Sequence, residues 1–268
     1  MAKERLDVLL TEQGFFESRE ASKRGIMAGI VLVNDEPVDK PGTKISTDAT
    51  IRIKGTLMPY VSRGGFKLKK ALDVFSIDLT DRVMIDVGAS TGGFTDCGLI
   101  NGAKFSYAID VGSNQLAWKL RQDPRVLSME KTNFRHMEAS SLTGELPTFA
   151  CMDVSFISIK LLLPVLKKIL PNDGEIVALI KPQFEAGKQA VGKNGIIKDK
   201  AIHYQVVSDI VEFARHLELV PLGLSFSPIR GSAGNIEFLI HLSQKGNDKI
   251  TDEIIKQVIN EAHTTTQS

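Results

Sequence analysis

Four ionisable residues stand where open α/β sheets place their active sites. Asp153 and Lys181 each end an apolar run, Glu237 lies in the last apolar run, and Lys67 follows two adjacent glycines. The carboxyl ends of parallel strands meet at one edge of a sheet, so these side chains are expected to gather there. Solvation alone explains a single charge at a strand end. Four such residues indicate a site that moves a proton or stabilises a developing negative charge.

A glycine-rich loop predicts a binding site for a cofactor that contains adenosine. An apolar run ends at Asp86 and leads into Gly88, and a second apolar run ends at Asp110. Gly92 and Gly93 follow Gly88 in the same loop. This is the layout of a strand, a glycine turn, a helix and a second strand whose last carboxylate can bind ribose hydroxyls.

Two other interpretations of the loop are less favoured. A dinucleotide site needs G-x-G-x-x-G, but the residue two positions after Gly88 is Ser90. A hydrolase nucleophile elbow would use Ser90 with a later acid and a histidine. The histidines available, His216 and His241, lie inside apolar helix or strand patterns. The run from Asp86 to Thr95 resembles the first motif of S-adenosylmethionine-dependent methyltransferases, which need not bind a pyrophosphate.

From residue 63 onward, apolar β-rich runs alternate with helical patterns, which predicts a doubly wound, mostly parallel sheet. Strands are expected at 83–87, 105–110, 126–129, 148–153, 175–180, 219–226 and 235–242. Helices are expected up to Phe75 and near 93–100, 113–121, 158–169, 200–217 and 250–262. The gap between the last two strands is too short for a helical crossover, so these strands should be antiparallel. This α/β, Rossmann-like sheet of seven strands with one reversed is similar to that of the methyltransferases.

The first 55 residues resemble the small α+β RNA-binding module named after a small-subunit ribosomal protein. The matching segments are Arg5-Leu-Asp, Ser18-Arg19 with Ala21, Gly29 to Asn34, and Lys40-Pro-Gly. In that family, arginines and lysines at the edge of the helix and turn contact structured RNA. A small protein-contact domain is the alternative. The resemblance implies RNA contacts from Arg5, Arg19, Lys23, Arg24 and Lys40, and from Arg63 beyond the module.

The order Lys67, Asp153, Lys181, Glu237 resembles the ribose 2'-O-methyltransferases of the RrmJ and fibrillarin-like class. Together with S-R-G-G-F-K-L, M-D-V-S-F-I-S and I-K-P-Q-F-E, it closely resembles the TlyA family over roughly residues 1–243. Members of that family have been labelled hemolysins. Their characterised activity is methylation of cytidine 2'-hydroxyls in ribosomal RNA. The resemblance therefore implies S-adenosylmethionine as cofactor and ribosomal RNA or ribosomal subunits as partner.

Each of these four side chains has an expected role. A ribose hydroxyl becomes a good nucleophile only when its proton is withdrawn, and a lysine can do this or stabilise the alkoxide. We assign Lys181 to the hydroxyl and expect Asp153 to orient it. Lys67 and Glu237 should hold the ribose and the lysine. No metal is required.

Cofactor contacts are expected from the glycine loop and from the strand that follows it. The residues are Asp86, Gly88, Ser90, Gly92, Gly93 and Asp110. Asn133 follows the third strand and could bind adenine, although a turn asparagine is almost as well supported. The glycine- and lysine-rich stretch 185–195 is either a flap that closes over RNA or an ordinary solvated loop.

Composition agrees with a cytoplasmic protein without a membrane span. The net charge is +1, but basic residues are in excess in residues 1–70 and acidic ones in the rest. Apolar runs are too short to cross a bilayer, and the charged amino terminus is unlike a signal peptide. Cys97 and Cys151 are the only cysteines and are expected to be reduced and buried. The domains expected are 1–55 for RNA binding, a linker at 56–62, a methyltransferase domain at 63–245 and a tail at 246–268.

Two rival functions remain to be weighed. A membrane-active hemolysin would need an apolar span or a strongly amphipathic exposed helix, and neither is evident in the sequence. A non-catalytic RNA-binding factor would use the cofactor fold as a scaffold only. The complete set Lys67, Asp153, Lys181 and Glu237 argues against that second alternative.

Overall fold

The chain forms two compact units, Met1–Pro59 and Tyr60–Ser268. The computed structural model describes residues 3–16, 18–54, 58–187, 190–192, 195–231 and 233–265. The boundary falls inside the expected linker at 56–62, of which residues 56 and 57 lie outside the described residues. Because each unit has its own core, each is described separately.

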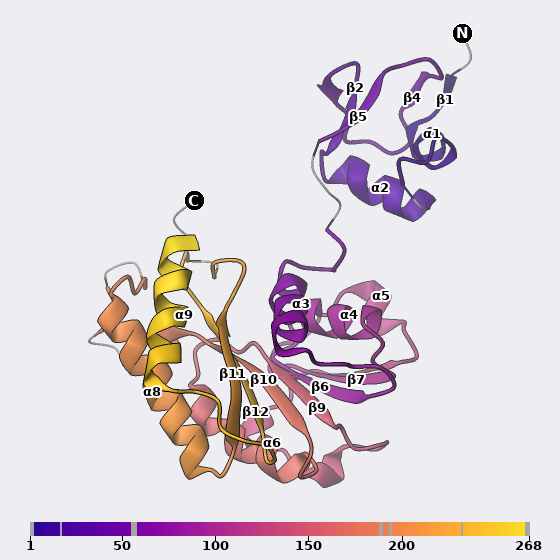
Figure 1. The fold of residues 1–268 in the computed structure, drawn as a ribbon. Helices are drawn as coiled ribbons and strands as arrows, with labels where there is room; N and C mark the ends of the chain where they lie inside the picture. Colours follow the sequence, from indigo (N-terminus) through magenta and orange to yellow (C-terminus); the bar gives the residue numbers. More distant parts are fainter. Residues whose placement is uncertain are drawn as a thin grey trace. The chain divides into compact units, whose positions relative to one another are not determined.

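The first unit joins two helices to short antiparallel strands (Figure 1). Its elements are β1 (Lys3–Arg5), α1 (Leu6–Glu12), α2 (Arg19–Met27), β2 (Val31–Val33), β3 (Glu36–Pro37), β4 (Lys44–Ser46) and β5 (Ile51–Ile53). Ser18 caps α2, and its side chain accepts a hydrogen bond from the Ala21 amide at 3.2 Å. Arg5 ends β1, and α1 begins at the next residue, Leu6.

A small apolar core holds this unit together. Leu6, Leu10 and Ile26 come from the two helices and are completely buried. They pack against Val31 of β2 and Ile45 of β4. The helices therefore cover the strands through the apolar faces that their sequence periodicity predicts.

The second unit is built on a seven-stranded sheet in the order β11-β12-β10-β9-β6-β7-β8. The strands are β6 (Val83–Val87), β7 (Phe105–Ile109), β8 (Val126–Met129), β9 (Phe149–Met152), β10 (Glu175–Ile180), β11 (Val220–Phe226) and β12 (Phe238–Ser243). Strand β12 lies between β10 and β11 and runs antiparallel to both. The predicted antiparallel final pair is thus confirmed, with the reversed strand inside the sheet.

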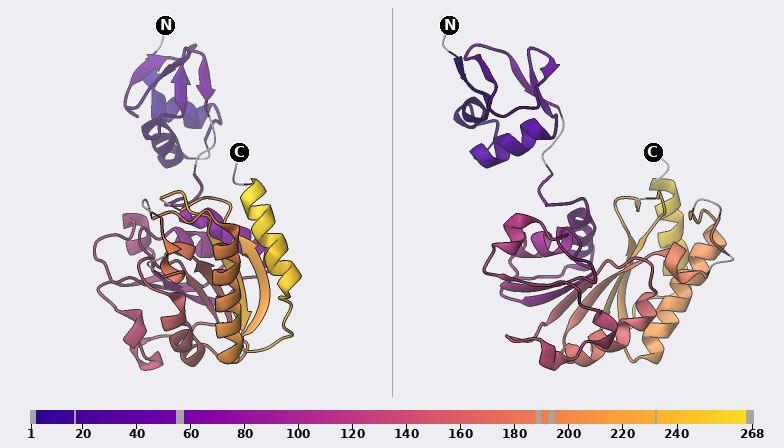
Figure 2. Two further views of the ribbon diagram at one scale, coloured as in Figure 1. Left: turned by 90° about the vertical axis from the view of Figure 1, so that its left-hand side faces the viewer. Right: turned by 180° about the vertical axis from the view of Figure 1, so that it is seen from behind.

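Helices cover both faces of this sheet (Figures 1 and 2). One layer contains α3 (Gly64–Phe75), α4 (Gly93–Ile100) and the short α5 (Trp118–Arg121). The other contains α6 (Leu163–Ile169), α8 (Lys200–His216) and α9 (Asp252–Thr265), and α7 (Pro182–Glu185) lies beside α8. Successive residues of a strand pack into opposite layers, as Met84 and Ile85 of β6 do.

Two predicted helices are shorter than expected, for local reasons. Residues 113–117 are not helical because the Ala117 amide donates to the Thr91 carbonyl and Asn114 has a φ of 58°. The segment expected as one helix at 158–169 is divided into a 3₁₀ turn, Ile159–Leu161, and α6. Pro164 lies in the first turn of α6, where its missing amide costs no hydrogen bond.

The chain carboxyl-terminal to β12 is part of the second unit. The expected helix at 250–262 forms as α9, which packs against α8 and β11. Its residues Ile255, Ile259 and Ala262 belong to the larger core. The stretch after residue 246 is therefore tied to the sheet over most of its length.

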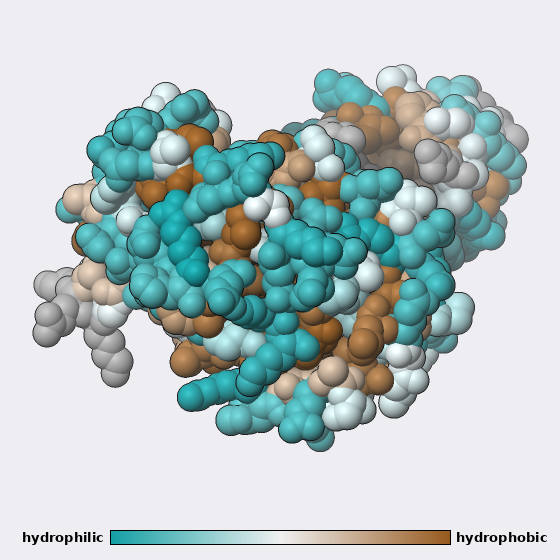
Figure 3. Space-filling view, turned by 60° about the horizontal axis from the view of Figure 1, so that its bottom comes forward, coloured by the Kyte–Doolittle hydropathy of each residue, from teal (hydrophilic) through white to brown (hydrophobic). Residues whose placement is uncertain are grey.

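Apolar side chains are scattered over the surface. Figure 3 brings the lower side of Figure 1 forward and shows small hydrophobic groups among hydrophilic ones. Among the described residues, every helix is too short or too polar to cross a membrane.

Candidate active site

A carboxylate held between two lysines lies at the carboxyl end of β9. Oδ2 of Asp153 accepts a hydrogen bond from Nζ of Lys67 at 3.1 Å. Nζ of Lys181 forms an ion pair with Oδ1 of the same carboxylate at 2.6 Å. Asp153 directly follows β9, and Lys181 directly follows the neighbouring parallel strand β10. The sheet therefore brings them together as expected.

The other two expected residues complete this cluster from outside the parallel strands. Lys67 projects from α3 and donates to Oε2 of Glu237 at 2.7 Å. Glu237 immediately precedes the reversed strand β12 and is almost fully buried. Gly231 is required beside it, because a Cβ there would lie 2.4 Å from Oε1 of Glu237. The structure thus places Glu237 against Lys67, where the sequence only suggested a general supporting role.

Two cations and two anions balance one another in this buried cluster. Burial would lower the pKa of Lys67, but Asp153 and Glu237 outweigh it, so the pKa is raised above its usual value. Burial would raise the pKa of Asp153, but Lys67 and Lys181 hold it below its usual value. The raised pKa keeps Lys67 protonated, and its positive charge in turn favours the ionised form of Asp153.

Ser155 also contacts Lys181 and was missed by the sequence interpretation. Its Oγ accepts a hydrogen bond from Nζ of Lys181 at 3.0 Å. Asp153 and Ser155 thus hold the lysine from two sides. The available signal was its position two residues after Asp153, within the motif M-D-V-S-F.

Asp86 lies below the glycine loop and supports it. The carboxylate is fully buried, and Oδ2 accepts hydrogen bonds from the amide and the hydroxyl of Thr95 at 2.9 and 2.7 Å. Burial raises the pKa of Asp86 to about 7. The sequence expectation places Asp86 on the cofactor, whereas the structure shows it anchoring the first turn of α4.

The glycines of the loop meet different steric demands. Gly88 has a φ of 84°, and a Cβ there would lie 2.7 Å from the Asp153 carbonyl. Gly92 packs against Leu120, whose Cδ1 would lie 2.3 Å from an added Cβ. A Cβ at Gly93 would lie 2.3 Å from Oγ of Ser62 and 2.9 Å from the amide nitrogen of Gly65 in α3. Of the three, Gly88 and Gly93 border the cavity that Lys67 and Lys181 line, which we call the lysine cavity.

The lysine cavity has a volume of about 340 Å³ and an open mouth. It is lined by residues that include Arg63, Lys67, Gly88, Asp153, Lys181 and Arg230. Arg230 comes from the loop between β11 and β12, which the sequence interpretation left without a role. Lys67 and Lys181 therefore face a space large enough for a small organic group.

A second cavity, the Asp110 cavity, also has a volume of about 340 Å³. Its lining includes Gly88, Asp110, Asn133, Phe134, Asp153 and Phe156. The two oxygens of Asp110 accept hydrogen bonds from the amides of Ser90 and Gly112 at 2.8 and 2.7 Å. Each carboxylate oxygen has a second lone pair, which remains for a ribose hydroxyl.

The two cavities share Gly88, Ser90, Asp153 and Ser155. Ser90 lies at a φ of 48° and turns the loop between them. The apolar walls of the Asp110 cavity and the carboxylate of Asp110 suit a nucleoside. The residues present thus fit a cofactor made of adenosine and an amino acid, which the residues of the Asp110 cavity would hold.

Asn133 lines the Asp110 cavity but also has a structural role. Its side-chain oxygen accepts a hydrogen bond from the Arg135 amide at 3.1 Å and caps the 3₁₀ turn Phe134–His136. The alternative of a turn asparagine therefore describes this residue, although its side-chain NH₂ and the second lone pair of Oδ1 remain to contact a base.

Phe156 is a second residue that the sequence interpretation missed. It lies in the wall of the Asp110 cavity, yet 90% of its surface is exposed. Its φ of 64° is unusual for an aromatic residue. Its ring lies 5.0 Å from that of Phe184, between centroids. The motif M-D-V-S-F again contained the signal.

The stretch expected as a flap is anchored at both of its ends. Glu185 accepts hydrogen bonds from the Ser158 hydroxyl and the Ile159 amide at 2.5 and 2.8 Å. The carbonyl of Gly195 accepts one from the side chain of Asn235 at 2.8 Å. Residues 188–189 and 193–194, on which much of the flap hypothesis depends, lie outside the described residues.

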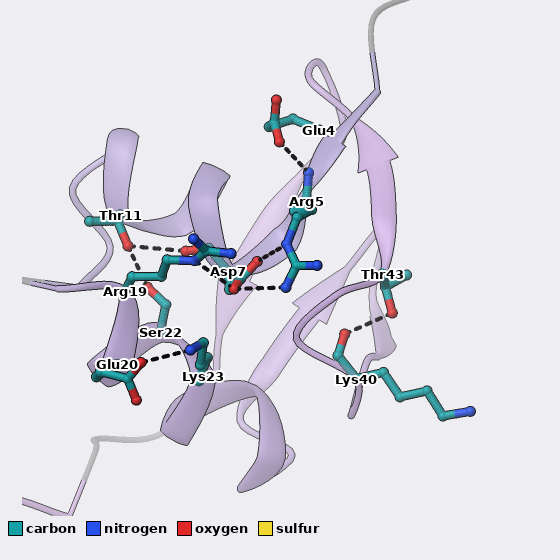
Figure 4. A network of polar contacts seen from close by, with 10 residues as sticks. All are labelled: Glu4, Arg5, Asp7, Thr11, Arg19, Glu20, Ser22, Lys23, Lys40 and Thr43. Atoms are coloured by element: carbon teal, nitrogen blue, oxygen red, sulfur yellow. Dashed lines mark hydrogen bonds and ion pairs between the residues drawn. The ribbon is translucent and has the colours of Figure 1, made fainter.

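The basic residues expected to contact RNA fall into two kinds in the first unit (Figure 4). Arg5 and Arg19 converge on the buried carboxylate of Asp7, with Nε to oxygen distances of 2.9 and 2.8 Å. Hydrogen bonds from Arg5, against the effect of burial and with the help of Arg19, lower the pKa of Asp7 to about 2. Lys23 pairs with Glu20 at 2.7 Å. These basic side chains are partly engaged within the unit.

Arg24 and Lys40 are exposed and complete the predicted basic set of the first unit. Arg63 caps α3 in the second unit and lines the lysine cavity. The structure thus places Arg63 beside the expected catalytic residues rather than with the module.

Known proteins resemble both units. Residues 60–244 match the family described as FtsJ-like methyltransferase, and residues 4–51 match the S4 domain. A Bacillus subtilis protein, YqxC, described as a candidate rRNA methyltransferase, is 54% identical over 98% of this chain and 95% of its own. The 16S/23S rRNA (cytidine-2'-O)-methyltransferase TlyA of Mycobacterium tuberculosis is 36% identical over 96% of each chain.

A solved structure has the same organisation. It is that of a Streptococcus thermophilus protein described as a candidate hemolysin, and it is 52% identical to this chain with a TM-score of 0.77. The match covers 100% of this chain and 98% of that one. Methyltransferase and hemolysin thus both occur as descriptions of proteins with this two-unit architecture.

Proposed function

Since the chain belongs to the TlyA family of FtsJ-like methyltransferases with an S4 domain, we propose that it methylates a ribose 2'-hydroxyl of ribosomal RNA. The methyl donor is S-adenosylmethionine, and the nucleotide is a cytidine. The observation that carries the proposal is the Lys67–Asp153–Lys181 chain of ion pairs, which lies where the two cavities meet.

The Asp110 cavity is proposed to hold the cofactor. The carboxylate of Asp110 would bind the ribose hydroxyls, and Phe134 and Phe156 would contact adenine. Gly88 lets the loop pack directly against the Asp153 carbonyl, where an added Cβ would clash, and this contact keeps the cofactor loop beside Asp153. S-adenosylmethionine, when bound, supplies a methyl group already activated by its sulfonium.

The lysine cavity is proposed to hold the target ribose. Lys181 holds the 2'-hydroxyl and either takes its proton or balances the charge that develops on the oxygen. Asp153 and Ser155 keep Nζ of Lys181 aimed, which limits the geometry of attack. Lys67, fixed by Glu237, keeps Asp153 ionised.

The first unit supports a large RNA substrate. It provides exposed basic side chains at Arg24 and Lys40 and partly exposed ones at Arg5 and Arg19. Such residues bind the phosphate backbone without reading its sequence. Ribosomal RNA as the substrate implies that the protein works in the cytoplasm.

The test is transfer of labelled methyl groups from S-adenosylmethionine to purified ribosomal subunits and to protein-free ribosomal RNA. We expect incorporation as 2'-O-methylcytidine in RNA digests. If the folded protein binds the cofactor but labels no RNA under either condition, the proposal is wrong. If it binds RNA but no S-adenosylmethionine, the non-catalytic RNA-binding function replaces it.

A further inference from the structure

A third cavity, the Arg230 cavity, opens beside the lysine cavity and has a volume of about 270 Å³. It is lined by Ile197, Lys198, Arg230, Ile236 and His263. Arg230 lines the lysine cavity as well, so the two spaces meet at one side chain. Figure 1 shows the loop between β11 and β12 beside the upper end of α9.

The walls of this cavity are fixed by buried hydrogen bonds. Asn235 is 1% exposed, and its Oδ1 accepts a hydrogen bond from the Ile197 amide at 2.8 Å. Its Nδ2 donates to the Gly195 carbonyl at 2.8 Å. A single buried side chain thus joins the segment before α8 to the loop that carries Arg230. Nη1 of Arg230 donates to the Gly234 carbonyl at 2.9 Å, which fixes the guanidinium on that loop.

His263 also lines the cavity, and it is held in place by a second histidine, His203. Nε2 of His263 lies 2.8 Å from Nδ1 of His203, which is fully buried in α8. Burial, and then the charge of His263, lowers the pKa of His203 to about 4, so the inner ring is neutral. His203 therefore orients the ring of His263 in the cavity wall.

Positive charge gathers around this space from two separate segments, residues 198–200 and Arg230. Burial first, then Lys200 and Arg230, lowers the pKa of His263, and Asp199 opposes this only in part. Lys198 adds a further cation to the lining. Asp199 caps α8, and its Oδ1 accepts a hydrogen bond from the Ala201 amide at 2.8 Å. Such a potential favours an anion.

We propose that the Arg230 cavity binds a phosphate of the RNA backbone next to the ribose that occupies the lysine cavity. Lys198 and Arg230 neutralise the phosphate, and His263 provides a polar contact. This inference rests on the proposed function, because it takes the lysine cavity as the place of the target ribose. Its consequence is that the strand leaves the reaction site past Arg230, toward the end of α9.

The test is the salt dependence of binding to protein-free ribosomal RNA, measured by filter binding with the full chain. Lys198→Gln should weaken binding several-fold and reduce the slope of log K against log salt by about 0.7–0.9, the effect of one phosphate contact. His263→Gln should weaken binding without changing that slope at pH 8. The matched control is Lys245→Gln, an exposed lysine just after the far end of β12.

In the methylation assay, Lys198→Gln should raise the KM for RNA and leave kcat and the Kd for S-adenosylmethionine unchanged. If Lys198→Gln and Lys245→Gln have the same salt slope as wild type, the phosphate site does not exist, whatever the enzymatic result. If wild type binds RNA without methylating it, the proposed function fails while the slope still decides on the phosphate site. If wild type does not bind RNA even at low salt, the site is also wrong.

Discussion

Oδ1 of Asp153 lies 2.6 Å from Nζ of Lys181, at the ends of two neighbouring parallel strands. The other oxygen of the carboxylate contacts Nζ of Lys67 at 3.1 Å. Asp153 is therefore shared between two lysines, of which one is fixed by Glu237 and the other by Ser155. In this arrangement Lys181 lines the lysine cavity next to the Asp110 cavity, where a substrate would contact its amine.

Replacing Lys181 should abolish methyl transfer without unfolding the protein. Lys181→Ala is expected to lower kcat by about 10²-fold or more, because a positioned group that takes the proton or balances the developing charge contributes that much. The measurement is initial rates with labelled S-adenosylmethionine, with unfolding by urea as the check on stability. Lys245→Ala is the matched control. Wild-type rates in Lys181→Ala would contradict the assignment.

Removing the charge of Asp153 should cost both stability and activity. Asp153→Asn leaves two buried lysines without their shared carboxylate, and breaking such a pair costs about 3–5 kcal/mol. Urea unfolding at pH 7 measures the loss. Combining it with Lys181→Met should recover part of the stability, because the remaining Lys67–Glu237 pair is balanced, but not the activity, because Lys181 is absent. An Asp153→Asn protein as stable and active as wild type would show that the ion pairs have neither role.

Asp110 should determine cofactor affinity and leave RNA binding unchanged. Asp110→Asn keeps the size of the side chain but weakens charge-assisted hydrogen bonds to ribose hydroxyls. A loss of about 10-fold or more in affinity is expected from the 1.5–3 kcal/mol that such bonds contribute. Isothermal titration calorimetry with S-adenosylmethionine gives the Kd. Because Asp110 also holds two loop amides, circular dichroism must show that the fold is retained.

Glu175, which lies far from the active site, should make the free energy of unfolding depend on pH. A hydrogen bond from His241, against the effect of burial and with the help of Arg82, lowers the pKa of Glu175 to about 2. A carboxylate with a depressed pKa contributes stability that is complete above its unfolded value of about 4.5 and lost as pH falls toward 2. Glu175→Gln should therefore be less stable than wild type by roughly 3 kcal/mol at pH 6.5.

The difference between the Glu175→Gln protein and wild type should shrink as the pH falls from 4.5 toward 3. Urea unfolding at several pH values measures it. A difference that does not vary over this range would mean that packing, and not the ionised pair, is responsible.

The basic residues of the first unit should separate into two groups by experiment. Arg24→Gln and Lys40→Gln remove exposed charges, so RNA affinity and its salt dependence should fall while stability stays the same. Arg5→Gln removes a partner of the buried Asp7 and should also destabilise the unit. Thermal unfolding and filter binding distinguish the two effects. Equal stability of the Arg5→Gln and Arg24→Gln proteins would contradict this division.

Local residue patterns were sufficient to predict the helices and strands of the second unit and the position of the glycine loop. Strands of the sheet were predicted to within a few residues because fully buried runs alternate with amphipathic helices. The largest shift, at the start of β12, arises because residues 235–237 are used for side-chain contacts of Asn235 and Glu237. Helix lengths at 113–117 and 158–162 depended on backbone contacts that no periodicity contains.

Which residues could carry the chemistry was determined by the sequence, because the strand ends and the glycine loop can be read from apolar runs and turn residues. Which atoms meet was decided only by the folded chain. Lys67 and Glu237 are 170 residues apart, and their contact requires α3 and the reversed strand β12 to close around β9 and β10. The same closure buries Asp86 under the loop and brings Arg230 to the lysine cavity, since contacts between distant segments arise only from tertiary packing.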